Sequence, residues 1–123
     1  PEASSGRVHF PAPLKLGWSS ASITVAACHI KLEEIFTTVF REIDARGHWD
    51  LIKTFDGIYN NRVTTGGTKK STHAWGIAVD LNASTNRYGT KGDMPREIIQ
   101  IFERHSFVHL KHDPMHFQYA EGY

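Results

Sequence analysis

Cysteine is nearly absent from this chain, whose 123 residues include only Cys28. No disulfide can form within the chain, so we expect no disulfide framework and assign Cys28 to core filling. No apolar run approaches the roughly 18 residues needed to cross a bilayer, which excludes a membrane span. No basic segment is paired with an apolar one at the N-terminus, so no signal peptide is visible.

The chain also lacks a large excess of either positive or negative charge. The chain has 14 Lys and Arg residues against 13 Asp and Glu residues, for a formal net charge of +1. Because no long basic run is present, we expect no nucleic-acid partner and disfavour a metal-dependent nuclease. The length fits a single domain over residues 1–123, and we expect it to act as a monomer.

Histidine, in contrast, is abundant. The chain has eight, and four of them fall within the last 19 residues. This excess directs the search for a metal site to the C-terminal segment. The histidines are His9, His29, His48, His73, His105, His109, His112 and His116.

Apolar spacing predicts two helices. Six apolar residues from Leu32 to Ile43 recur at helical spacing, and Gly47 is a suitable C-terminal stop. Asp93 is a good N-cap for a second helix that runs to about His105.

The strands predicted are short. The stretch from Ile77 to Leu81 predicts a strand whose Ala78 and Asp80 point to the face opposite its apolar residues. Residues 107–119 predict a strand pair, and 51–55 with 58–59 predict strands around an Asp56-Gly57 turn. We therefore expect an α+β fold, with two helices packed on a small, mostly antiparallel sheet after an irregular N-terminal arm over residues 1–24.

Asp80 is the anomaly in its strand, because a buried carboxylate needs a strong partner. His73 lies seven residues earlier, and a bend at Gly76 would let its imidazole fold back towards Asp80. The small Ala78 would leave room for an ion on the same face. His116 lies on the polar face of the last strand. If the two strands are neighbours, His73, Asp80 and His116 converge.

Two imidazoles and one carboxylate leave a fourth position for water, which is typical of a catalytic zinc site. Asp113 stands three residues before His116, with Pro114 between them. A carboxylate there would lie close to the metal without binding it. Such a group is suited to take the proton from zinc-bound water.

The two motifs resemble a known family. Ser-x-His-x-x-Gly-x-Ala-x-Asp from Ser71 to Asp80, followed by Asp-x-x-His-Phe from Asp113 to Phe117, is similar to the zinc peptidases that group D-alanyl-D-alanine carboxypeptidases with L-alanyl-D-glutamate endopeptidases. Phage endolysin domains are among the latter. The resemblance runs from about Cys28 to Tyr119.

The resemblance implies one Zn²⁺ ion held by His73, Asp80 and His116, with Asp113 as the catalytic base. It further implies that Arg62 steadies a substrate carbonyl or carboxylate and that Ser71 lines the substrate groove. A guanidinium suits both kinds of oxygen. Family members often carry a Gly- and Trp-containing turn where this chain has only residues 108–112, so the groove wall there is expected to differ.

The implied function is hydrolysis of peptidoglycan stem peptides at the bacterial cell wall, as an L-alanyl-D-glutamate endopeptidase. A D-alanyl-D-alanine carboxypeptidase is the alternative within the family. A non-catalytic, zinc-stabilised wall-binding module is the alternative of another class, although such a module has no need of Asp113. His109 and His112 match no family position and are expected to lie outside the set of ligands.

Overall fold

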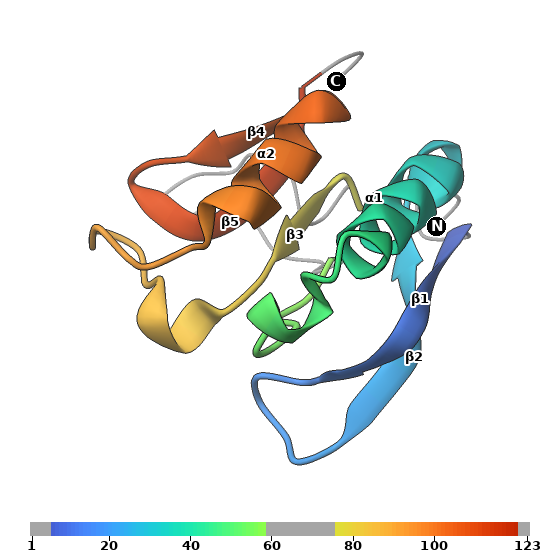
Figure 1. The fold of residues 1–123 in the computed structure, drawn as a ribbon, viewed down its shortest axis with the longest axis horizontal. Coiled ribbons are helices and arrows are strands. Elements are labelled where there is room, and N and C mark those ends of the chain that lie inside the picture. Colours follow the sequence, from blue (N-terminus) through green and yellow to red (C-terminus); the bar gives the residue numbers. More distant parts are fainter. Residues whose placement is uncertain (1–5, 59–75, 121–123) are drawn as a thin grey trace, which may run out of the picture.

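The computed structural model describes residues 6–58 and 76–120. In these ranges two helices accompany five strands, which form two small antiparallel sheets. The predicted α+β class is confirmed, with the strands divided between two sheets. Figure 1 shows helix α2 in front of the three-stranded sheet, and helix α1 between that sheet and the β1–β2 hairpin. The elements are β1 Gly6–Lys15, β2 Ser22–Cys28, α1 Glu33–Ala45, β3 Ala78–Asp80, α2 Arg96–Arg104, β4 Phe107–Leu110 and β5 Asp113–Tyr119.

Helix α1 forms where the apolar spacing predicts it. Its buried residues are Phe36, Val39, Phe40 and Ile43, on the face turned towards the core. Gly47 follows the helix with a φ of 77°, the left-handed conformation that ends many helices.

The prediction of an irregular N-terminal arm was wrong for its described residues, 6–24. These form β1 and the start of β2, paired antiparallel. Buried and exposed residues alternate along β1, and Val8 and Phe10 face the core. Pro11 and Pro13, which suggested irregular structure, lie where the pairing register shifts between His9 and Leu14. Prolines are tolerated there because they need not donate to the ladder.

Cys28 ends β2 and is fully buried in the core, as the prediction of core filling required. Burial, with a further contribution from the charge of Glu33, raises the pKa of its thiol to about 12. The thiolate needed for cysteine chemistry is therefore not formed near neutral pH.

The predicted strands around Asp56-Gly57 were also wrong for the described residues, which end here at Ile58. Residues Trp49–Leu51 form a 3-10 turn, and Phe55 makes only isolated bridges, to Leu16 and Leu81. The Asn82 side chain holds this segment: its Oδ1 accepts from the backbone N–H groups of Lys53 and Thr54, at 2.6 and 3.1 Å. Hydrogen bonds to the side-chain amide of Asn82 thus hold the backbone of residues 53–54, where a hairpin partner was expected.

Strands β3, β5 and β4 form the second sheet in that order. The predicted strand at 77–81 and the predicted pair at 107–119 are both confirmed. Val79 lies opposite Phe117. Both are buried, and the Phe117 ring stacks on Phe102 of α2 at 4.3 Å. One face of the sheet is therefore committed to the core.

Helix α2 starts at Arg96, three residues after the predicted N-cap Asp93. Asp93 instead exchanges two hydrogen bonds with the fully buried Asn86: the Asp93 backbone N–H donates to Asn86 Oδ1 at 2.8 Å, and Asn86 Nδ2 donates to Asp93 Oδ1 at 2.9 Å. Pro95 takes the N-cap position. The helix buries Ile98, Ile101 and Phe102.

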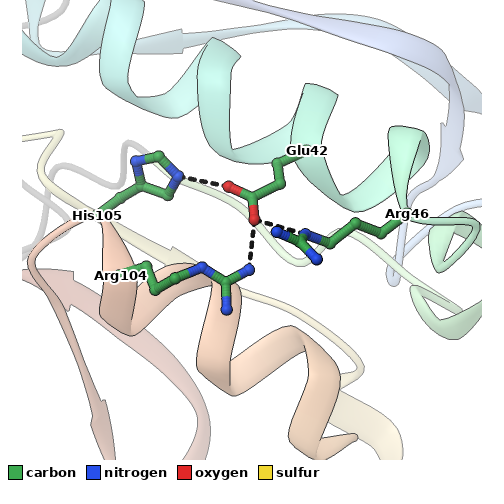
Figure 2. A network of polar contacts seen from close by, with 4 residues as sticks. All are labelled: Glu42, Arg46, Arg104 and His105. Carbon is green, nitrogen blue, oxygen red and sulfur yellow. Dashed lines mark hydrogen bonds and ion pairs between the residues drawn. The ribbon is translucent and has the colours of Figure 1, made fainter.

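A charged network joins the two helices at their outer surface. Glu42 of α1 accepts hydrogen bonds from Arg46 Nε at 2.7 Å, from His105 Nε2 at 2.8 Å and from Arg104 (Figure 2). The hydrogen bonds from His105, Arg104 and Arg46 lower the pKa of Glu42 to about 2. No helix in the described ranges is long and apolar enough to cross a membrane.

This network predicts a specific acid response. Because the pKa of Glu42 lies below its unfolded value of 4.5, its stabilisation is present above pH 4.5 and is lost as the pH falls towards 2. Glu42→Gln should lower the free energy of unfolding at pH 6 by about 1 kcal/mol, the upper end for exposed pairs. The free energy of unfolding of the Glu42→Gln protein should then fall less steeply than that of the wild type between pH 4.5 and 2. Urea unfolding across this range measures both, with the exposed Glu103→Gln as control. Parallel pH profiles for wild type and Glu42→Gln would contradict the role of the network.

Candidate metal centre

Three side chains with metal-binding atoms meet on the three-stranded sheet. Single ligand atoms of Asp80, Asp113 and His116 all lie within 4.8 Å of one another. Asp80 ends β3, and Asp113 and His116 come from β5. Because Asp80 lies directly opposite His116 in the ladder, both side chains project from the face opposite Val79 and Phe117.

Asp113 joins the cluster at an irregular point of the sheet. Strict alternation along β5 would place it on the face of Met115 and Phe117, away from His116. Asp113 instead begins β5 beside Leu110, where the β4–β5 register shifts between His109 and Leu110. His109 Nε2 donates to the carbonyl oxygen of Pro114 at 2.7 Å and holds this turn.

The His116 imidazole has an acceptor oxygen at each nitrogen. Nδ1 lies 3.1 Å from Asp80 Oδ1, and Nε2 lies 2.9 Å from Gln118 Oε1. The two side chains of the His116–Asp80 pair are only 7% and 13% exposed, so water screens the pair weakly. Burial lowers the pKa of His116, but the hydrogen bond and charge of Asp80, with Gln118 and the charge of Asp113, outweigh it and raise the pKa above its usual value.

This geometry fits a divalent cation. With acceptors at both nitrogens, the ring either carries two protons or leaves Nδ1 to a cation that lies between it and the Asp80 carboxylate. Two ligands of a tetrahedral zinc ion, each bound at about 2.0–2.1 Å, lie about 3.3 Å apart. The 3.1 Å between Nδ1 and Oδ1 is close to that spacing. Imidazole nitrogen and carboxylate oxygen are also donors that zinc accepts.

A comparison with protein families bears on the same residues. Residues 65–119 match a family model described as D-alanyl-D-alanine carboxypeptidase. Over this segment the chain is similar to that family. The resemblance predicted from the two motifs is thereby confirmed, and it supports a peptidase. Comparisons with curated proteins and with solved structures found no significant match.

The matched segment includes all three residues of the cluster, together with His73 and Ser71. The structure thus brings together two of the three predicted zinc ligands, Asp80 and His116, with the predicted base Asp113. His73, Arg62 and Ser71 lie outside the described residues, so their roles stay predictions. Arg62 also precedes the matched segment, and its role rests on the resemblance of the motifs alone.

Three polar residues near the site were missed by the sequence reasoning. Gln118 contacts His116, Asn82 accepts a hydrogen bond from the backbone of Lys53, and Asn86 exchanges hydrogen bonds with Asp93 in the segment that follows β3. Asn82 adopts a φ of 54°, and Asn86 Nδ2 donates to the backbone carbonyl oxygen of Asn82 at 3.0 Å. The strand alternation that placed His116 on the polar face also places Gln118 there. Nothing local in the sequence marks Asn86.

Two cavities are lined by residues of the segment that follows β3. One of about 160 Å³ is lined by Thr54, Asp56 and Met115 among others, and one of about 330 Å³ by Thr90 and Asp93 among others. Both are also lined by Ser84 and Arg87. Met115 precedes His116 in β5 and projects from the opposite face of the strand, so the smaller cavity is separate from the cluster.

Gly76 occupies the position predicted for a bend within the family motif. It has a φ of 70°, and its carbonyl accepts from the backbone N–H of His29 at 2.9 Å. A Cβ at this position would lie 2.6 Å from the His29 nitrogen. The chain before β3 is therefore held against the end of β2 by a contact that only glycine permits.

Gly76→Ala should destabilise the fold more than a positive φ alone explains. Gly47 is the matched control, with a φ of 77° and open space around its position. Gly47→Ala should cost about 1–2 kcal/mol from backbone strain. Gly76→Ala should exceed this by at least about 1 kcal/mol, because it adds a clash with backbone and weakens a hydrogen bond. Urea unfolding of both variants measures the difference, and equal losses would show that the close approach is unimportant.

Proposed function

We propose that this chain is a single zinc-dependent peptidase domain that hydrolyses peptide bonds in peptidoglycan stem peptides. The observation that carries the proposal is the meeting of Asp113 with Asp80 and His116 in one cluster inside the segment matched by the family model. His73, Asp80 and His116 would hold one Zn²⁺ ion. When bound, the zinc would polarise the scissile carbonyl and lower the pKa of its water to about 7.

The contacts support different roles for the two carboxylates. Asp80 touches His116 directly, through Oδ1 at 3.1 Å. The charge of Asp113 also raises the pKa of His116, but it contributes less than Asp80 and Gln118 do. Asp80 is therefore assigned as a ligand, and Asp113 as the base one step further out. The Asp113 carboxylate would take the proton from the attacking water and return it to the leaving amine.

Two bonds of the stem peptide are candidates. The Tyr-Asn-x-Arg stretch from Tyr59 to Arg62 resembles the L-alanyl-D-glutamate endopeptidases, and we propose that activity. The description of the matching family favours D-alanyl-D-alanine carboxypeptidase as the second candidate. In either case Arg62 would steady a substrate oxygen, and Ser71 would line the groove. The proposal places the activity at the cell wall, with a monomer carrying every required residue.

The division of roles predicts distinct effects of two substitutions. Asp113→Asn should retain one zinc per chain and lower the rate of hydrolysis of purified peptidoglycan by at least about 100-fold, the usual contribution of a general base. His116→Ala should lose both zinc and activity. Metal analysis and turnover measurements on each variant test this, with the exposed Asp50→Asn as control. Loss of zinc from Asp113→Asn would make Asp113 a ligand, and undiminished turnover would remove it as the base.

Mass spectrometry of digested peptidoglycan identifies the bond. An endopeptidase releases peptides that begin with D-glutamate, whereas a carboxypeptidase releases free D-alanine. A wild-type protein that binds zinc and peptidoglycan and releases neither product would be a binding module, and the proposed function would be wrong.

A further inference from the structure

We infer that Gln118 is a positioning residue of the proposed metal centre, which holds the His116 ring so that Nδ1 faces the metal position beside Asp80. This inference deepens the proposed function and rests on it. It concerns the orientation and tautomer of a ligand, and it assigns no chemical step to Gln118.

The hydrogen bond to Gln118 sets the tautomer. Gln118 Oε1 lies 2.9 Å from His116 Nε2, and a carboxamide oxygen can only accept. Nε2 must therefore carry a proton. A neutral imidazole has only one N–H, so the lone pair available to a metal is on Nδ1, the nitrogen 3.1 Å from Asp80 Oδ1.

The sheet gives Gln118 the space for this contact. Gln118 follows His116 by two residues in β5, so both side chains project from the same face. Its partner across the β3–β5 ladder is Ala78, just as Asp80 is the partner of His116. A larger side chain at Ala78 would compete with the Gln118 amide for the space beside the ring. The small Ala78 is therefore compatible with a Gln118 amide placed beside the ring.

Partners of this kind affect metal affinity. An acceptor on the second nitrogen of a metal-binding histidine orients the ring and raises its basicity, and loss of that acceptor costs about 10–100-fold in affinity. Gln118 has the geometry of such a partner. The role proposed for Asp113 is different, because a base would act on the metal-bound water and would leave the tautomer of the His116 ring unchanged.

The test compares zinc affinity and ring tautomer in matched variants. Gln118→Met keeps the length of the side chain but leaves only a weak acceptor, and should lower zinc affinity by about 10–100-fold in chelator competition. Gln118→Glu keeps an acceptor oxygen and should retain affinity. Gln100→Met, the same change on the exposed face of α2, should have no effect.

Nitrogen NMR of the His116 ring gives a readout that a merely structural role would not move. In the zinc-bound wild type and in Gln118→Glu, the proton should be on Nε2 and the metal on Nδ1. Gln118→Met should lose this single pattern while its metal-free thermal unfolding stays close to that of the wild type. Unchanged affinity and an unchanged ring pattern in Gln118→Met would overturn the inference. A wild-type protein that binds no zinc would instead overturn the proposed function, so the two failures are distinguishable.

Discussion

The pairing of Asp80 with His116 across β3 and β5 is the constraint on which the site depends. A slip of one residue in this ladder would turn both side chains to the opposite face. The adjacent pair, Val79 and Phe117, prevents such a slip, because both are fully buried and Phe117 stacks on Phe102 of α2. The apolar side of the sheet therefore aligns the polar side. The core near the site sets the geometry of the proposed ligands as well as the stability of the fold.

The features that the sequence predicted correctly are those with a short repeat. Helical spacing between Leu32 and Ile43 located α1, and strand alternation placed Asp80 and His116 on polar faces of their strands. Both patterns arise because a regular element presents one face to the core, so neighbouring residues carry the information. That the two strands are neighbours required a further assumption, and the resemblance of the motifs supplied its best support.

The features that were predicted wrongly depend on distant partners. Asp93 looks like a helix cap from its neighbours, yet its backbone N–H and carboxylate are engaged by Asn86. The segment before Asp56 looks like a strand, yet Asn82, some thirty residues later, organises its backbone. Pro11 and Pro13 suggested irregular chain because the register shift that accommodates them cannot be seen locally. In each case a long-range polar contact or a pairing irregularity outweighed local preference.

The same distinction separates the residues of the site. His116 and Asp80 are specified by alternation and pairing, but Asp113 reaches them only because the β4–β5 register is irregular beside it. For the proposed function, that irregularity has a chemical consequence. A ligand needs a fixed direction, which regular pairing with a buried neighbour provides, whereas a base must reach a water molecule slightly further from the metal. The strand end, held by the contact of His109 with the Pro114 carbonyl, supplies that offset position. In the proposed function, a sheet with perfect alternation through Asp113 would keep the proposed ligands Asp80 and His116 but would have no second carboxylate on their face to serve as the base.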